Sequence, residues 1–120
     1  MIERTRATAI GSEWLAAWNA HRPDRVVAHF ADDVVVASPV AERIRPGSGG
    51  VLRGKAEVLE YYGAGLALND DLHFTLIETL IGVDHLTIVY RNERGVLVAE
   101  TLVLRDDGVV TEVSVAYGEG

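Results

Sequence analysis

One acidic residue, Glu100, stands in a segment that otherwise has the pattern of an apolar β-strand. Alternate residues of a strand point to the same face, so Glu100 shares its face with four aliphatic residues: Val96, Val98, Leu102 and Leu104. A carboxyl group buried there must be paired, or must stay protonated with a raised pKa. Such a group could act as a general acid or base. The opposite face is nearly as apolar, so a hydrogen-bonded Glu100 on the solvent side is the alternative.

Ser38 is a second candidate for chemistry, at the end of a short strand predicted over residues 34–36. With a histidine and a carboxylate it could act as a nucleophile, but the sequence lacks the GxSxG pattern of a nucleophile elbow. Asp32 and Asp33 could form a catalytic pair of carboxylates. Aspartate also favours turns and helix ends, and we expect that role for both.

The residues that bind metals or phosphates do not gather in this sequence. The histidines lie far apart along the chain, at His21, His29, His73 and His85, and there is no cysteine. The glycine-rich stretch at 46–50 lacks the GxxxxGK[ST] and GxGxxG patterns of phosphate-binding loops. We therefore expect no metal ion and no organic cofactor. Arg43 and Arg45 could meet an acidic substrate, and solvent exposure without a ligand is the alternative.

Helices are predicted in the first half of the chain. Apolar residues at three- and four-residue spacing predict a helix over residues 4–20, with Trp14 and Trp18 on its apolar face. Pro23 suits the first turn of a second helix, which would run to residue 30. Residues 40–53 are expected to form a loop, either a functional lid or a mobile segment. A third helix is expected over residues 55–68.

From residue 72 onward, alternating apolar and polar residues predict strands only. These strands are expected over residues 72–81, 85–91, 96–104 and 109–117. Turns at roughly 11-residue intervals imply a four-stranded antiparallel meander. Helices first and strands last are typical of the α+β class, with the helices packed on one face of a curved sheet.

Size and composition fit one folded domain over residues 1–120. Hydrophobic residues make up 48% of the chain, which favours a packed core over disorder. The net charge of −7 opposes contact with phosphate backbones, so nucleic acid is not an expected partner. The start of the chain lacks the apolar segment of a signal peptide, and no apolar run reaches roughly 18 residues. We expect a cytoplasmic protein that does not bind membranes.

Several motifs resemble those of the nuclear transport factor 2-like superfamily, in its SnoaL-like and ketosteroid-isomerase-like branch. They are WLAAWNAH at 14–21, FADD at 30–33, SP at 38–39, RGK at 53–55, EYY at 60–62 and VAYG at 115–118. The likeness covers nearly all of the chain. The FADD element is typical of this fold and not of one activity, because such folds host many functions.

The resemblance implies a cone, in which a curved sheet wraps three helices and leaves an apolar pocket at its open end. Glu100 would then point into this pocket. Besides Glu100 and Ser38, the side chains expected around the ligand are Trp14, Phe30, Val36, Tyr62, Tyr90, Leu102 and Tyr117. Trp18 is expected in the core. If Trp14, Phe74 and Tyr90 filled the space, no ligand pocket would remain.

Similarity to ketosteroid isomerases implies roles for four positions. In that family a tyrosine on the first helix binds the substrate carbonyl, and an aspartate before a proline is the base. A protonated acid completes the oxyanion hole. The matching residues here are Trp14, Ser38 and Glu100, and a supporting tyrosine matches Tyr62. Serine is not a general base, and a positioned base contributes roughly 10²- to 10⁴-fold. Steroid isomerisation itself is therefore not the expected reaction.

Three hypotheses about function remain open. The first is an isomerase or cyclase that acts on a small hydrophobic, carbonyl-bearing molecule, with Glu100 transferring a proton or binding the ligand oxygen. The second is a non-catalytic domain for ligand binding or protein interaction. The third is chemistry like that of limonene-epoxide hydrolases, with Glu100, Arg91 and Glu78 as its charged groups.

The resemblance also implies a homodimer through the outer face of the sheet. The residues expected to be exposed on this face are apolar enough to allow it: Leu97, Val103, Val110 and Ala116. The expected partners are thus a small hydrophobic molecule and a second copy of the chain.

Overall fold

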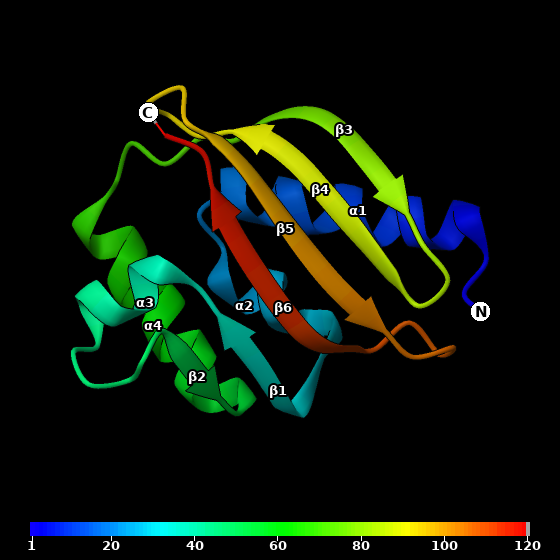
Figure 1. Cartoon of the computed structure of the whole chain (residues 1–120), viewed down its shortest axis with the longest axis horizontal. Coiled ribbons are helices and arrows are strands. Elements are labelled where there is room, and N and C mark those ends of the chain that lie inside the picture. The colour runs from blue at the N-terminus through cyan, green and yellow to red at the C-terminus, as the bar shows by residue number, and fades with distance from the viewer. Residues whose placement is uncertain (120) are drawn as a thin grey trace.

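The computed structural model describes residues 1–119 and shows one curved sheet with helices against a single face (Figure 1). The helices are α1 (Arg4–Asn19), α2 (Pro23–Val26), α3 (Pro39–Ile44) and α4 (Lys55–Leu68), with a 3₁₀ turn η1 (Val27–His29) after α2. The strands are β1 (Phe30–Ala37), β2 (Val51–Arg53), β3 (Thr75–Ile81), β4 (His85–Arg91), β5 (Leu97–Leu104) and β6 (Val110–Tyr117). They lie in the order β2-β1-β6-β5-β4-β3. The architecture is therefore the predicted α+β class.

The predicted antiparallel meander is confirmed. Each of β3, β4, β5 and β6 pairs with the next in antiparallel register. The bounds of α4 and β4 agree with the predicted helix over 55–68 and the predicted strand over 85–91. These elements have clear local patterns and short connections, so the sequence is sufficient to place them.

The second predicted helix is shorter than expected, and the strand after it is longer. Helical structure stops at His29, and β1 begins at Phe30, where a helix was predicted. Phe30 pairs with Val110 of β6 in a parallel arrangement. Because that partner is distant in the sequence, no local pattern marks where β1 starts.

The prediction of a loop over residues 40–53 is wrong for much of this stretch, which contains most of α3 and all of β2. Pro39 occupies the first turn of α3, and the Ser38 hydroxyl caps this helix by accepting a hydrogen bond from the Val40 N–H at 3.3 Å. Residues 51–53 form β2, which pairs with the edge of β1. Gly50, with a φ of 80°, helps the chain turn back between them.

The strand β3 begins three residues later than predicted, because residues 72–74 are tied to α1. The Asn19 Nδ2 donates to the Phe74 carbonyl at 2.9 Å, and the Asn19 Oδ1 accepts from the Phe74 N–H at 2.7 Å. The side chain thus pairs both backbone groups of Phe74 where no neighbouring strand does.

A bulge in β6 moves Val110 from the outer face to the core. Val103 pairs with Glu112, whereas the next residue of β5, Leu104, pairs with Val110. The extra residue, Thr111, reverses the alternation, so Val110 is only 1% exposed. The prediction that Val110 lies on the exposed face is wrong for this reason.

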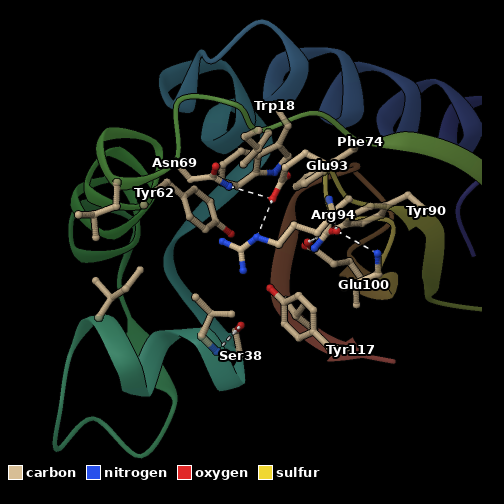
Figure 2. A pocket seen from close by; sticks show the side chains of 18 of the residues that line it. Trp18, Ser38, Tyr62, Asn69, Phe74, Tyr90, Glu93, Arg94, Glu100 and Tyr117 are labelled. Atoms are coloured by element: carbon tan, nitrogen blue, oxygen red, sulfur yellow. Dashed lines mark hydrogen bonds and ion pairs between the residues drawn. The ribbon is translucent and has the colours of Figure 1, made fainter. Parts of the chain in front are cut away.

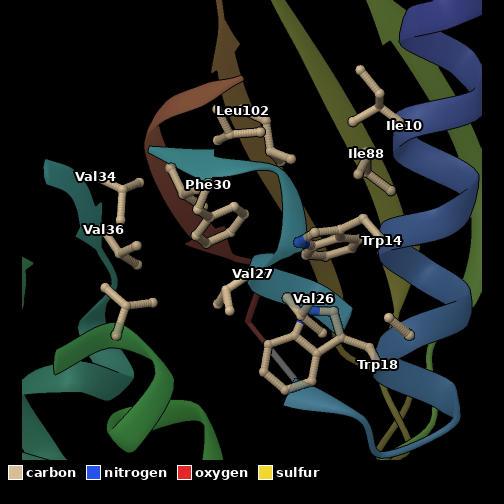
Figure 3. Close-up of a cluster of buried hydrophobic side chains, with 14 of the residues drawn as sticks. Ile10, Trp14, Trp18, Val26, Val27, Phe30, Val34, Val36, Ile88 and Leu102 are labelled. Carbon is tan, nitrogen blue, oxygen red and sulfur yellow. The ribbon is translucent and has the colours of Figure 1, made fainter. Parts of the chain in front are cut away.

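The core lies between the sheet and the helices (Figure 3). It combines side chains from α1, from the α2–η1 segment and from the inner faces of β1, β4 and β5, among them Ile10, Trp14, Val27, Val34, Ile88 and Leu102. Helix α1 contacts β3 and β4, whereas α4 contacts β1 and β2. The two helices therefore cover opposite ends of the sheet. No helix within residues 1–119 is long and apolar enough to cross a membrane.

Candidate active site

A cavity of about 620 Å³ opens between α3 and α4 on one side and strands β4, β5 and β6 on the other. Its inner wall is made of buried side chains: Trp18, Val36, Tyr62, Phe74, Tyr90 and Glu100. Its outer wall is made of exposed ones, including Arg43, Arg94 and Tyr117. The cavity therefore has an apolar floor and a polar mouth, which is the usual form of a small-molecule site.

Glu100 lies at this floor, and the prediction that its strand face points inward is confirmed. Its side chain is 6% exposed, and its neighbours across the sheet are Ile88 on β4 and Val115 on β6. Val98 and Leu102, two residues away on either side, are buried as well. The carboxyl group is thus the one acidic group that the described chain places in its core.

Tyr90 is the hydrogen-bond donor to this carboxyl group. The Tyr90 hydroxyl donates to Glu100 Oε1 at 2.5 Å, a length typical of a bond to a charged oxygen (Figure 2). No other donor within residues 1–119 bonds to Glu100, and its second oxygen, Oε2, is not sealed off from the cavity. Oε2 is therefore available to a ligand.

Burial gives Glu100 an unusual titration. Loss of water around the charged form raises the pKa of Glu100 from 4.5 to about 7, although the Tyr90 hydrogen bond opposes this rise. Near neutral pH the carboxyl group is therefore present in both protonation states. A group of this kind can accept and return a proton under ordinary conditions.

The tyrosines around the cavity remain neutral hydrogen-bond donors. Burial and the Glu100 charge raise the pKa of Tyr62 and Tyr90 well above the ordinary value for a phenol. The same two causes raise the pKa of Tyr117 to about 12. Each hydroxyl can therefore donate to a ligand oxygen without losing its proton.

Ser38 lies in the cavity wall but has a structural partner. Its hydroxyl caps α3, and its presence lowers the pKa of the Tyr61 and Tyr117 hydroxyls against the rise caused by burial. No histidine within residues 1–119 lines the cavity. Ser38 can thus orient a ligand, and the described residues supply no base that would make it a nucleophile.

Six of the predicted site residues lie in the cavity wall, and three lie outside it. Glu100, Ser38, Val36, Tyr62, Tyr90 and Tyr117 line the cavity. By contrast, Trp14, Phe30 and Leu102 are core residues that do not line it. The expectation that these three surround the ligand is corrected, because their side chains are enclosed by other core residues.

Trp14 does not take its expected place beside the ligand, whereas Trp18 lies in the core as expected and also lines the cavity. Trp14 packs against Phe74 and Tyr90, with ring centroids 6.1 and 6.0 Å away, whereas Trp18 reaches the cavity wall. They are one helical turn apart on one face, so periodicity cannot distinguish them. Trp14, Phe74 and Tyr90 do stack together, yet the cavity remains beside them.

The turn between β4 and β5 brings two charged residues to the cavity that sequence reasoning missed. Glu93 accepts a hydrogen bond from Asn69 Nδ2 at 3.0 Å, and Arg94 Nε lies 4.0 Å from Glu93 Oε2 (Figure 2). The sequence marks this stretch only as a hairpin turn ending in Gly95. Its approach to the end of α4 depends on sheet curvature, which has no local signal.

The charged groups required by the epoxide-hydrolase hypothesis do not meet. A register shift between Leu76 and Glu78 turns Glu78 to the outer face, opposite Val89, where it is exposed. The Arg91 guanidinium is also exposed and donates to the Gly95 carbonyl at 2.9 Å. Within residues 1–119, no group of three or more histidine, aspartate or glutamate side chains could hold a metal ion.

Comparison with known proteins identifies close similarity over most of the chain. A family model described as SnoaL-like domain matches residues 12–116. The crystal structure of a SnoaL-like protein of unknown function from Burkholderia thailandensis is 36% identical. It superposes with a TM-score of 0.91 over 98% of each chain. No curated protein matches the chain significantly.

More distant structures share the fold alone. A Kribbella flavida protein named as a candidate ketosteroid isomerase is 16% identical with a TM-score of 0.75, over 97% of this chain and 80% of its own. A Sinorhizobium meliloti protein named as a candidate polyketide cyclase is 15% identical with a TM-score of 0.74, over 90% of this chain and 94% of its own.

Proposed function

The chain belongs to the SnoaL-like domain family, and on that premise we propose that its cavity binds a small hydrophobic molecule with a carbonyl or hydroxyl oxygen. Glu100 is the proton-transferring group in this proposal, which makes the protein an acid–base enzyme of the isomerase or cyclase type. One observation carries it. A buried carboxyl group with a pKa near 7 lies at the floor of an apolar cavity and has one oxygen open to it.

The proposed chemistry is proton transfer next to a carbonyl. The Glu100 carboxylate accepts a proton from the carbon beside the ligand carbonyl, and the C–H electron pair forms an enolate. The enolate oxygen accepts a hydrogen bond from the Tyr62 or Tyr117 hydroxyl. In a ligand with a C=C bond next to that carbon, the enolate is a dienolate, and protonated Glu100 returns the proton to its far carbon, so the double bond shifts and the carboxylate is regenerated.

Binding is tested with a matched pair of bicyclic probes, 2-naphthol and 2-tetralone. The phenol donates a hydrogen bond, so its binding should strengthen as Glu100 ionises with rising pH through about 7. The ketone only accepts, so it should bind better below that pH. Naphthol fluorescence reports its own binding, and displacement of naphthol reports the ketone.

Glu100→Gln should remove both pH dependences, because glutamine does not titrate. Glu78→Gln, a change of the same type at an exposed position, should leave them intact. Absence of naphthol and tetralone binding in the wild-type protein would overturn the proposed function.

Catalysis is tested by exchange of the tetralone α-hydrogens in deuterated water, followed by proton NMR. The wild-type protein should accelerate exchange, with a rate that rises as Glu100 ionises, and Glu100→Gln should reduce the rate by roughly 10²-fold or more. Binding without accelerated exchange would instead identify a non-catalytic ligand-binding domain.

A further inference from the structure

Two arginines from separate parts of the chain line the same cavity at its exposed side. Arg43 belongs to α3, and Arg94 belongs to the turn between β4 and β5. Both residues are exposed, whereas Glu100 is buried, so the cavity has cationic groups at its mouth and a carboxyl group at its floor. The acid–base proposal uses only the floor and leaves the mouth unexplained.

The guanidinium groups are poorly paired within the protein. Among residues 1–119, Arg43 forms no ion pair or side-chain hydrogen bond, and Arg94 approaches only Glu93, at 4.0 Å through its Nε. Figure 2 shows the Arg94 guanidinium extending toward the space lined by Tyr62 and Tyr117. Its terminal nitrogens therefore remain available to a ligand.

The carboxylate of Glu93 alone does not cancel the positive charge of the two arginines at the cavity mouth. Its Oε2 accepts from Asn69 Nδ2 at 3.0 Å, and its Oε1 accepts from the His73 N–H at 3.4 Å. Both oxygens are thus used to tie the turn to the segment after α4, and the side chain is only 15% exposed. Glu93 therefore helps to position Arg94 but leaves the terminal nitrogens of its guanidinium group free for a ligand.

The charges around the cavity differ from those of the whole chain. The protein has a net charge of −7, yet the cavity wall holds two arginines against Glu93 and a Glu100 that is partly protonated at neutral pH. Burial raises the pKa of the Tyr61 and Tyr117 hydroxyls, and the Arg43 charge opposes that rise. The field of Arg43 therefore reaches the cavity wall.

We propose that the ligand of this cavity is an organic acid, whose carboxylate is bound by Arg43 and Arg94 at the mouth while its apolar body and second oxygen extend to Glu100. Planar guanidinium groups match a carboxylate with paired N–H donors. The inference rests on the proposed function and specifies its substrate class. It also explains why a hydrophobic cavity in an acidic protein has a cationic entrance.

The test compares 6-hydroxy-2-naphthoic acid with its methyl ester and with 2-naphthol in the full chain. The acid should bind about tenfold more tightly than the ester, and added salt should reduce this preference. Arg43→Gln and Arg94→Gln should each remove most of the preference. Arg45→Gln is the matched control, because Arg45 pairs with Glu60 and does not line the cavity.

The possible results distinguish failure of the organic-acid inference from failure of the proposed acid–base function. Equal affinity for acid and ester, or preference retained in both arginine variants, overturns the organic-acid inference while leaving Glu100-dependent binding of 2-naphthol in place. Failure of all three probes to bind the wild-type protein overturns both. Because the two arginines are exposed, circular dichroism should show that their variants fold normally.

Discussion

A buried carboxyl group makes folding depend on pH, and Glu100 is such a group. Its pKa is about 7 in the folded protein and 4.5 when water surrounds it. The folded state therefore holds a proton more firmly than the unfolded state does. This contribution to stability is complete below pH 4.5, decreases as the pH rises, and is lost above about 7.

Glu100→Gln should abolish this pH dependence. The pKa of Glu100 differs by about 2.5 between the folded and unfolded states, and each unit corresponds to about 1.36 kcal/mol. The unfolding free energy of the wild-type protein should therefore decrease by about 3 kcal/mol between pH 4.5 and 7. The variant, which has no charge to bury, should become more stable than the wild type above pH 7. Urea unfolding at a series of pH values measures this, and parallel curves for the two proteins would contradict the raised pKa.

At the scale of elements, the cavity depends on how α1 is attached to the segment before β3. Asn19 at the end of α1 pairs both backbone groups of Phe74, and Phe74 forms part of the cavity floor. The neighbouring His21 also reaches this segment, through Nε2 and the Leu72 carbonyl at 2.8 Å, but in an exposed position. Leu72 also lines the cavity, so both contacts reach its wall, but the Asn19 contact is partly buried and makes two hydrogen bonds where His21 makes one.

Asn19→Ala should lower the unfolding free energy by about 2 kcal/mol, because two partly buried backbone groups lose their partners. Ligand affinity should decrease as well, since Phe74 is no longer held. His21→Ala, which removes an exposed bond to the same segment, should lower stability by less than half as much. Urea unfolding and 2-naphthol titration measure both effects. Equal losses in the two variants would contradict the assigned role of Asn19.

At the scale of the whole molecule, the outer face of the sheet has no helix from residues 1–119 over it (Figure 1). The strand register places Val89, Ala99 and Ala116 side by side across β4, β5 and β6 on this face. Leu80 on β3 and Leu97 on β5 add apolar surface, at 49% and 41% exposure. A row of small apolar side chains allows close contact with a second flat surface, so we propose this face as a homodimer interface.

Ala99→Glu should convert the proposed dimer to a folded monomer, because two copies of a new carboxylate would meet near the centre of the interface. Ala9→Glu introduces the same charge on an exposed position of α1 and should leave the dimer unchanged. Sedimentation velocity across a dilution series measures the mass. A wild-type protein that stays monomeric at its highest concentration would refute this interface.

Local patterns in the sequence determined the parts of the fold that depend on near neighbours. The extents of α4 and β4, the meander of the last four strands and the shared face of Val98, Glu100 and Leu102 all follow from periodicity and turn residues. The burial of Glu100 does not follow from this pattern, because the opposite face of the strand is nearly as apolar, and only the packed sheet shows which face points inward.

Tertiary structure decided the parts that depend on distant partners. The start of β1 depends on pairing with β6, and the faces of Glu78 and Val110 depend on bulges that reverse the alternation. Sheet curvature brings Arg94 to the cavity, and packing places Trp18 in its wall instead of Trp14. Local periodicity indicates which side chains share a face of a strand. Bulges, long-range pairing and sheet curvature determine whether that face packs in the core, lines the cavity or is exposed to solvent.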